Sequence, residues 1–182
     1  HMNNLSGNLG IGHVRYPTAG GVGKEFAQPM YVNAPYGISL AHNGNLTNSK
    51  KLAAELFHAE RRHINTESDS EVLLNILALE LSKQEAVFPK PKDYFSAIEK
   101  THMRINGAYA VVALITGYGI LGFRDPLGIR PLTIGVRKGK NRNEYIISSE
   151  TALFSALGYK FLRDVEPGEA VFIDNSGKIF SQ

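Results

Sequence analysis

The sequence predicts an α+β fold, in which helices pack on antiparallel β-sheets. Strand-like segments come first, amphipathic helical segments follow between residues 48 and 104, and short strand-like segments fill residues 109–180. Segregation of this kind is typical of α+β domains, whereas parallel folds alternate strands with helices. A chain of 182 residues that is 43% hydrophobic has enough apolar side chains for one domain with a real core.

Two strands and a helix are predicted in the first third of the chain. Residues 9–14 alternate apolar and small side chains, which favours a buried strand, and residues 37–42 favour a second strand. Residues 48–60 predict a helix, and its apolar side chains recur at helical spacing on the face that packs: Leu52, Ala53, Leu56 and Phe57.

The helix predicted over residues 68–82 has the clearest signals. Ser68 and Glu71, three positions apart, form the pattern of a capping box. The apolar residues that follow have helical spacing: Val72, Leu73, Ile76, Leu77 and Leu79. A shorter helix is predicted over residues 93–104, and two prolines between residues 87 and 92 mark the loop before it.

The last part of the chain is predicted to be mostly strands, with one short helix over residues 150–157. The strands are expected at residues 109–115, 120–124, 132–136, 145–149, 170–173 and 178–180. The basic cluster at residues 137–142 lies between two of them. It is interpreted as a solvated hairpin loop, with phosphate or partner binding as the alternative.

Composition excludes several classes of protein. A formal charge of +3 without strong clustering does not predict nucleic-acid binding. No apolar run approaches the roughly 20 residues that span a bilayer, and no secretory signal pattern is present. The absence of cysteine excludes disulfides and cysteine-ligated zinc. We therefore expect a cytoplasmic protein with no nucleic-acid and no membrane partner.

Four segments carry a recognisable pattern: residues 12–20 (GHVRYPTAG), 41–45 (AHNGN), 66–71 (TESDSE) and 123–132 (FRDPLGIRPL). In this order they resemble the glutaminase domain of the amidophosphoribosyltransferase family, a group of class II, N-terminal-nucleophile glutamine amidotransferases. The resemblance covers essentially the whole chain. It implies a four-layer αββα sandwich with antiparallel sheets. It also implies hydrolysis of glutamine, with ammonia passed to phosphoribosyl pyrophosphate in purine biosynthesis.

Glutamine hydrolysis needs groups that hold both ends of the substrate amino acid. The guanidinium of Arg15 can bind a carboxylate through two parallel hydrogen bonds, although a surface ion pair is the alternative. Thr18 can add a hydroxyl to that carboxylate, or it can be an ordinary turn residue. Asp69 lies in the first turn of the predicted helix over residues 68–82, where an acidic side chain interacts favourably with the helix dipole. The resemblance implies that Arg15 and Thr18 bind glutamine and that Asp69 binds its α-ammonium.

Asn43 and Gly44 have two interpretations. By itself, the Asn-Gly pair predicts a tight turn. In the functional alternative, the Asn43 amide and the Gly44 N–H donate to the oxyanion of the tetrahedral intermediate, and glycine lets the backbone approach the substrate closely. The resemblance implies this oxyanion role, with Gly44 also contacting substrate, and it places Gln28 near the pocket. The segment at residues 123–132 is interpreted as a rigid corner in which Arg124 and Asp125 can pair.

The nucleophile that the resemblance implies, a cysteine at the start of the mature chain, is absent. His1-Met2 is interpreted as a tag-cleavage scar. Residues 1–182 are therefore predicted to be a glutamine amidotransferase type 2 domain that lacks its N-terminal strands and its phosphoribosyltransferase domain. We expect this chain alone to be inactive and its open sheet edges to favour a homo-oligomer. No metal or cofactor is expected in this domain, and magnesium with phosphoribosyl pyrophosphate is expected in the parent enzyme.

A second hypothesis is an amidotransferase-like module that binds glutamine or a partner without chemistry, and an enzyme using serine or threonine is a third. Other sites are rejected. His58 and His63 provide too few ligands for a metal. A triad of His42 with Ser68 and Asp69 lacks the strand–serine–helix elbow. Residues 18–25 depart from the phosphate-loop pattern at two positions.

Overall fold

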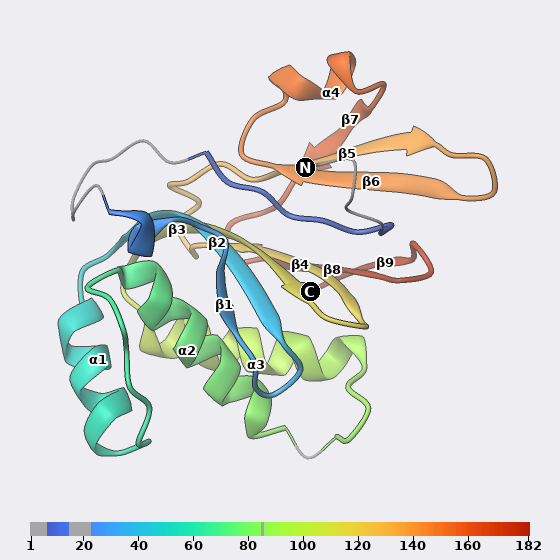
Figure 1. Ribbon diagram of the computed structural model, residues 1–182. Helices are drawn as coiled ribbons and strands as arrows, with labels where there is room; N and C mark the ends of the chain where they lie inside the picture. Colours follow the sequence, from blue (N-terminus) through green and yellow to red (C-terminus); the bar gives the residue numbers. More distant parts are fainter. Residues whose placement is uncertain (1–6, 15–22, 85) are drawn as a thin grey trace.

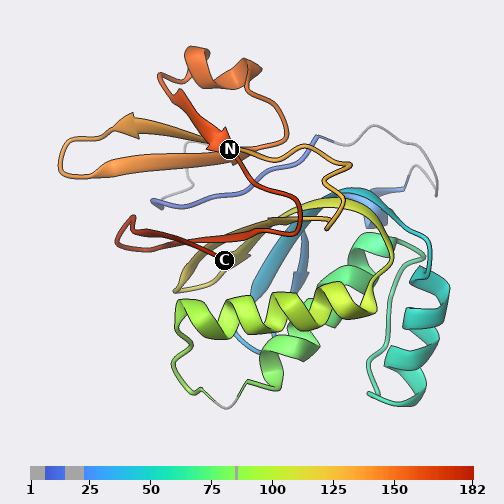
Figure 2. The same ribbon diagram turned by 180° about the vertical axis from the view of Figure 1, so that it is seen from behind.

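The computed structural model describes residues 7–14, 23–84 and 86–182, and it stacks four layers (Figure 1). The first layer contains α1 (Ser49–His58), α2 (Asp69–Ser82) and α3 (Pro91–Arg104). These helices cover one face of a six-stranded sheet. A three-stranded sheet follows, with the short helix α4 (Ala152–Ala156) on its far side (Figures 1 and 2). The predicted α+β class and its sandwich of antiparallel sheets are therefore confirmed.

All the strand pairs in the two sheets are antiparallel. The larger sheet has the order β1-β2-β3-β4-β8-β9, with β1 (Met30–Val32), β2 (Ile38–Leu46), β3 (Gly107–Ile115), β4 (Gly119–Arg124), β8 (Ala170–Asp174) and β9 (Ile179–Ser181). The smaller sheet has the order β6-β5-β7, with β5 (Thr133–Lys138), β6 (Asn143–Ser148) and β7 (Lys160–Asp164). A 3-10 turn, η2 (Lys24–Phe26), precedes β1.

Most of the core lies between the helices and the larger sheet. Helix α2 is its centre, because it contacts α1, α3, β1 and β2, and every residue from Ser70 to Leu81 is buried. Each large aliphatic side chain buried there contributes about 1.5–3 kcal/mol to stability. A smaller cluster lies between the two sheets: Ala110, Leu132, Ile134, Val165, Val171 and Ile173. The helix side of the larger sheet therefore provides most of the hydrophobic stabilisation.

The prediction of a buried strand at residues 9–14 is wrong. These residues form no strand, Gly10 and Gly12 are exposed, and the Val14 side chain is 97% exposed. The segment runs between the two sheets in both ribbon views (Figures 1 and 2). Glycine at alternate positions gives a strand no side chains to pack, so the small-apolar alternation was a weak signal. Strands β1 and β7 were not predicted, because β1 is only three residues long and β7 is largely exposed.

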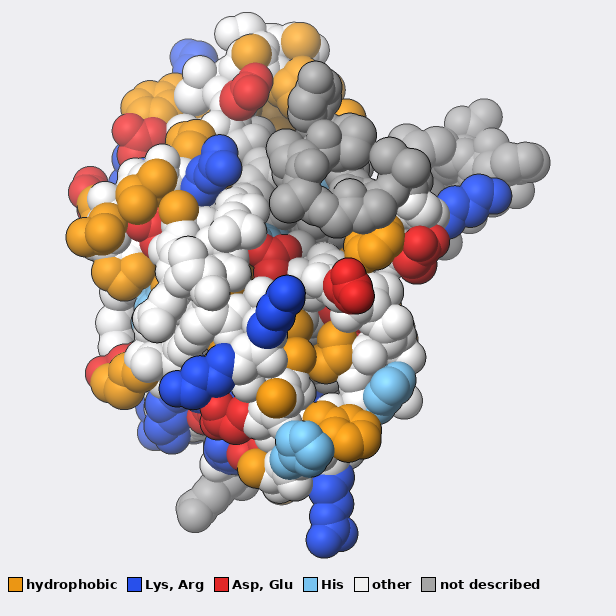
Figure 3. All heavy atoms as spheres, turned by 90° about the vertical axis from the view of Figure 1, so that its left-hand side faces the viewer, with side chains coloured by type: hydrophobic (Ala, Val, Ile, Leu, Met, Phe, Trp, Pro, Cys, Tyr) orange, Lys and Arg blue, Asp and Glu red, His pale blue; other side chains and the backbone are white. Residues whose placement is uncertain are grey.

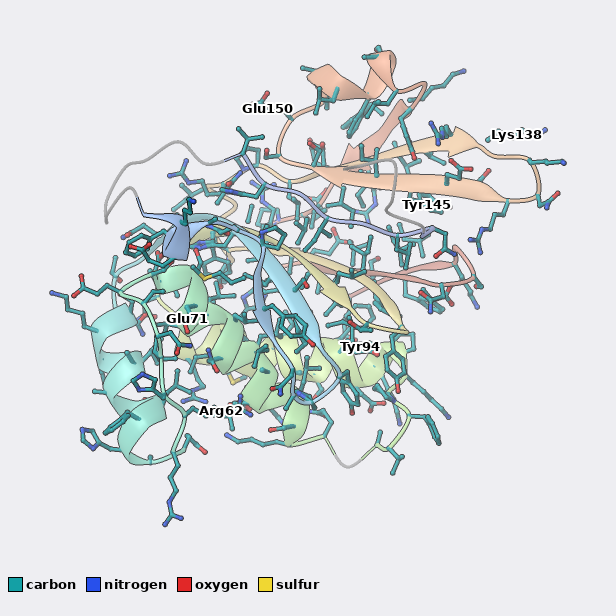
Figure 4. The ribbon with its side chains drawn as sticks, viewed as in Figure 1. Arg62, Glu71, Tyr94, Lys138, Tyr145 and Glu150 are labelled. Carbon is teal, nitrogen blue, oxygen red and sulfur yellow. The ribbon has the colours of Figure 1, made fainter. Side chains whose placement is uncertain are left out.

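The predicted capping box at the start of α2 is only half correct. The Ser68 hydroxyl does cap the helix, accepting from the Ser70 N–H at 3.3 Å. Glu71, labelled in Figure 4, reaches the preceding loop instead and accepts from the backbone N–H groups of Asn65 at 2.9 Å and Thr66 at 2.7 Å. Burial raises the pKa of Glu71, but hydrogen bonds from Thr66 and Asn65 outweigh it and lower that pKa. This carboxylate therefore fastens the loop to α2.

The basic cluster at residues 137–142 lies at the predicted hairpin: Arg137 and Lys138 end β5, and residues 139–142 form the loop before β6. Lys138 projects outward at this end of the smaller sheet (Figure 4). Two of its cations are engaged with the fold itself. Arg137 pairs with Glu144 at 2.6 Å, and Arg142 donates to the Asn175 carbonyl at 2.8 Å. The solvated-loop interpretation accounts for this cluster.

Candidate functional site

The Asn43-Gly44 pair lies inside β2, so the interpretation as a tight turn is wrong. Asn43 is opposite Ala110 and Gly44 is opposite Tyr109 in the β2–β3 register. Gly44 has a φ of +146°, which side-chain-bearing residues rarely adopt. A Cβ at this position would lie 2.0 Å from the carbonyl oxygen of Ala108. Glycine is therefore required here by the close approach of β3.

The hydrogen-bonding direction of β2 follows from its two ends. Successive residues of an antiparallel strand point their N–H and C=O groups to opposite edges. Just before β2, the Gly37 carbonyl accepts from Thr116, and just after it Thr47 donates to the Asn106 carbonyl at 2.8 Å. The odd-numbered residues of β2 therefore bond to β3, and the even-numbered residues face the opposite edge.

Gly44 is an even-numbered residue, and its N–H points away from β3. Tyr109, the residue of β3 opposite Gly44, confirms this, because it directs its own N–H and C=O to Asp125, on the side of β4. On the open edge, β1 pairs with β2 only as far as Leu40. Within the described ranges, the Gly44 N–H has no hydrogen-bond partner. It is a backbone donor held in place by the strand, and no described residue prevents it from binding a ligand.

The Asn43 side chain is exposed, and one end of its amide is held by His13. His13 Nε2 lies 3.0 Å from Asn43 Oδ1. This contact occupies the oxygen of the amide, and the Asn43 Nδ2 donor has no partner among the residues that the structure describes. Asn43 and Gly44 thus offer two unpaired donors on adjacent residues. Sequence reasoning did not assign His13 a role, although it belongs to the segment at residues 12–20.

Asp69 lies at the first position of α2, and it contacts the same edge of β2. Its Oδ2 accepts from the Leu46 N–H at 2.9 Å, and its Oδ1 lies 4.0 Å from His42 Nδ1. The side chain is 22% exposed, so part of the carboxylate faces solvent. The structure brings Asp69 and Gly44 to one edge, since Leu46 and Gly44 are neighbouring even-numbered residues of β2. A helix-terminal role and a ligand-binding role are compatible here.

His42 is buried beneath this edge. Its Nδ1 lies 3.0 Å from the Ser70 hydroxyl, and its Nε2 has no partner among the described residues. Burial lowers the pKa of His42 to about 4 against the opposing effect of Asp69, with smaller lowering effects from His13 and Arg130. The ring is therefore neutral at pH 7. The serine that it contacts is Ser70, only 2% exposed, so these residues present no accessible serine nucleophile.

Gln28 packs against the same histidine. Its Oε1 accepts from the His42 N–H at 2.7 Å, and its Nε2 donates to the Ser70 hydroxyl at 3.1 Å. Arg15 and Thr18 lie outside the described residues, so their predicted contacts with substrate stay predictions.

The corner at residues 123–132 is structural, as interpreted from the sequence, but Arg124 does not pair with Asp125. The Asp125 carboxylate is fully buried and accepts from four backbone N–H groups, those of Tyr109, Leu127, Ile129 and Arg130. Arg124 instead donates to the carbonyl oxygens of Val165 and Gly128. Both residues are therefore used to shape the chain between β4 and β5.

The two histidines that were considered as a metal site lie on or just after α1. His58 and His63 are exposed, and each lies edge-on to Phe57, with ring centroids 5.1 and 6.3 Å from it. Figure 3 shows two histidine side chains beside a hydrophobic one on the surface that includes α1. In the described part of the chain, no group of three metal-ligating side chains occurs. None of the helices described there has the length and apolar character needed to cross a bilayer.

Comparison with known proteins gives consistent matches. A family model described as a glutamine amidotransferase domain matches residues 21–156. The chain is 53% identical over 182 residues to an amidophosphoribosyltransferase of Pasteurella multocida and 55% identical over 183 residues to that of Escherichia coli. In both cases all of this chain but only 36% of the relative is covered, so the chain spans about a third of those proteins.

Two solved structures share this fold. The Bacillus subtilis glutamine phosphoribosylpyrophosphate amidotransferase, complexed with ADP and GMP, has a TM-score of 0.71 and 32% identity, covering 93% of this chain and 33% of that one. A structure described as the allosteric regulatory enzyme of purine biosynthesis has a TM-score of 0.73 and 35% identity, covering 93% of this chain and 34% of that one. A structure described as a predicted glutamine amidotransferase from Pseudomonas aeruginosa, at 16% identity and a TM-score of 0.57, shares the fold alone.

Proposed function

The chain belongs to the glutamine amidotransferase domain family, and from this premise we propose that it is the glutamine-binding domain of an amidophosphoribosyltransferase. The domain would release ammonia from glutamine. A phosphoribosyltransferase domain, outside these 182 residues and using magnesium, would combine the ammonia with phosphoribosyl pyrophosphate to make phosphoribosylamine for purine biosynthesis. The length of the relatives, about three times that of this chain, supports a partner domain of this kind.

The observation that carries the proposal is the pair of unpaired donors on β2. Attack on the glutamine side-chain amide turns its carbonyl oxygen into an oxyanion, which needs donors fixed in advance. The Gly44 N–H and the Asn43 Nδ2 group meet that need: one is set by the strand, and the other by the contact between His13 and Asn43 Oδ1. We assign these two donors to the oxyanion. We assign Asp69 to the α-ammonium of glutamine, because its Oδ1 makes no hydrogen bond to a described residue. Arg15 and Thr18 would hold the α-carboxylate.

The nucleophile would be a cysteine supplied by residues beyond this sequence, which contains none. Its sulfur attacks the amide carbon, and the carbon–nitrogen bond then breaks as the nitrogen leaves, protonated, as ammonia. Water hydrolyses the resulting thioester to glutamate and restores the thiol. The chain by itself would bind glutamine without hydrolysing it.

The test is glutamate release from glutamine by this chain and by the same chain extended to its native upstream start. We expect release only from the extended chain. Asn43→Asp in the extended chain keeps the oxygen that faces His13 but removes the Nδ2 donor, and it should lower kcat about 10²–10³-fold. Release by the unextended chain in proportion to its concentration would contradict the missing nucleophile. A folded, inactive extended chain would favour a glutamine-binding module without chemistry.

Self-association is part of the proposal for the isolated chain. Sheet edges β1 and β9 are only three residues long, whereas β6 is a six-residue edge strand of the smaller sheet. A strand of that length with unpaired backbone groups can add a strand from a second copy.

A further inference from the structure

The Gln28 side chain occupies the place of a neighbouring β-strand. Its Oε1 accepts from the His42 N–H at 2.7 Å, and its Nε2 lies 3.3 Å from the His42 carbonyl oxygen. A residue on an adjacent antiparallel strand would make the same pair of contacts, one through its carbonyl and one through its N–H. The primary amide of glutamine carries both groups on one side chain.

This substitution begins where β1 stops pairing. Met30 is opposite Leu40, the last residue of β2 that β1 reaches. His42 is the next residue along that edge, and Gln28 precedes Met30 by two positions. A β1 strand that paired further would bring its own carbonyl toward the Gly44 N–H. The Gln28 amide bonds to the backbone N–H and carbonyl of His42 but does not reach Gly44, so the Gly44 N–H keeps no partner among the described residues.

The amide is fixed in this orientation by two buried groups. Gln28 Nε2 donates to the Ser70 hydroxyl at 3.1 Å, and the same hydroxyl lies 3.0 Å from His42 Nδ1. His42 is 4% exposed and Ser70 is 2% exposed. The amide, the hydroxyl and the ring therefore close a triangle that spans β2 and the first turn of α2. Beyond Gly44, Asp69 satisfies the Leu46 N–H at 2.9 Å.

We propose that Gln28 is a positioning residue: its amide, locked by Ser70, ends the pairing of β2 at His42 and thereby presents the Gly44 N–H as an oxyanion donor. The inference rests on the proposed function only for the identity of the ligand. The arrangement of the edge stands on the contacts themselves.

The test uses this chain labelled with ¹⁵N, with amide hydrogen exchange measured for His42 and Gly44. In the unchanged chain, His42 should be protected and Gly44 should exchange close to the unprotected rate. Gln28→Leu removes both contacts and should speed His42 exchange about 2- to 12-fold, the range expected for one lost hydrogen bond. Gln28→Glu keeps the acceptor and should retain His42 protection. Gln84→Leu, which loses a bond from a glutamine to the Glu80 carbonyl, is the matched control and should leave both amides unchanged.

L-glutamine is then titrated into each variant while the Gly44 resonance is followed. We expect a shift in the unchanged chain and in Gln84→Leu, and loss of that shift in Gln28→Leu. A strongly protected Gly44 amide without ligand, or His42 and Gly44 amides that ignore Gln28→Leu, would overturn the inference. If glutamine shifts Gly44 in no variant, the proposed function fails, while the exchange pattern still decides the role of Gln28. If Gln28→Leu does not fold, Ser70→Ala replaces it: the Gln28 amide then loses the hydroxyl that holds it, and His42 exchange should speed, whereas an unchanged His42 rate would overturn the inference.

Discussion

Asp125 and Asp69 both accept hydrogen bonds from backbone N–H groups, but to different extents. Asp125, at the β4–β5 corner, is fully buried and surrounded by four backbone donors. Asp69, at the edge of β2, holds one backbone donor and is 22% exposed. A carboxylate has about four acceptor positions. A carboxylate whose acceptor positions are all occupied by its own backbone supports the fold. A carboxylate with unoccupied acceptor positions can also bind a ligand.

The pKa of Asp125 reflects this saturation. Burial raises it, but the hydrogen bonds from Ile129, Arg130, Tyr109 and Leu127 outweigh burial and lower it. The charge is therefore stabilised by hydrogen bonds, and none of the described cations pairs with it. The β4–β5 corner and the β2 edge should respond differently to mutation and to acid, and the predictions below test that difference.

The largest effect should come from Asp125→Ala. This change leaves several buried N–H groups without an acceptor, and each such group costs about 1–3 kcal/mol. We expect the free energy of unfolding in urea at pH 7 to fall by about 3 kcal/mol or more. Asp174→Ala is the control, because Asp174 also caps N–H groups, those of Ser176 and Lys178, but in an exposed turn. Equal losses of unfolding free energy in the two variants would contradict the view that Asp125 stabilises the fold through the buried N–H groups that it binds.

Acid should affect the β2 edge at a higher pH than the corner. The pKa of His42 falls from 6.5 to about 4 on folding, chiefly through burial. Between these values the unfolded chain binds a proton that the folded chain does not, so stability falls as pH drops from about 6.5 to about 4. The total loss is about 3 kcal/mol. Asp125, with a lowered pKa, contributes stability that is lost only below its unfolded pKa of about 4.

Urea unfolding at pH 7, 5.5 and 4.5 measures the His42 contribution, because all three values lie above the range in which the Asp125 contribution is lost. His42→Gln removes the titrating ring, and it should flatten the dependence of stability on pH in this range. Identical slopes in the variant and the unchanged chain would mean that His42 is not the group responsible.

The smallest effect on stability should come from Asp69→Asn. The asparagine oxygen can still accept from the Leu46 N–H, so the free energy of unfolding should change by less than about 1 kcal/mol. Glutamine binding should nevertheless weaken about 10- to 100-fold, because a charge-assisted hydrogen bond to the α-ammonium is lost. Calorimetric titration with glutamine measures this. A large loss of stability with unchanged binding would make Asp69 equivalent to Asp125.

Helix α2 and the strands after it could be predicted because their signals are local. Ser68 marks the start of α2, and the apolar residues after it are dense enough to be buried on every side. Gly119–Arg124 and Ala170–Asp174 are apolar runs bounded by turns, so their strand character does not depend on distant partners. Local patterns of this kind survive in the folded state because tertiary packing agrees with them.

The positions of the candidate-site residues in the fold could be predicted only in part, and their roles stay predictions. Asn43, Gly44 and Asp69 do lie on β2 and on the helix beside it, but sequence spacing alone favoured a turn at Asn43-Gly44. That turn is overridden by β3, a partner more than sixty positions away in the sequence. The roles of His13 and Gln28 were missed for a related reason. A polar side chain whose hydrogen-bond partners lie on another element leaves no periodic trace in its own segment.

The close approach of β2 and β3 at Gly44 has a counterpart one step away. At Gly107, opposite Leu46, a Cβ would lie 2.1 Å from the carbonyl oxygen of Asn45, much as one at Gly44 would meet Ala108. If the strands slid past each other, residues with side chains would face these two narrow points. The two glycines therefore fix the register of β2 against β3, and this register sets the position of the Gly44 N–H. Because the register depends on main-chain contacts, substitutions in the surrounding hydrophobic core should leave that N–H in place.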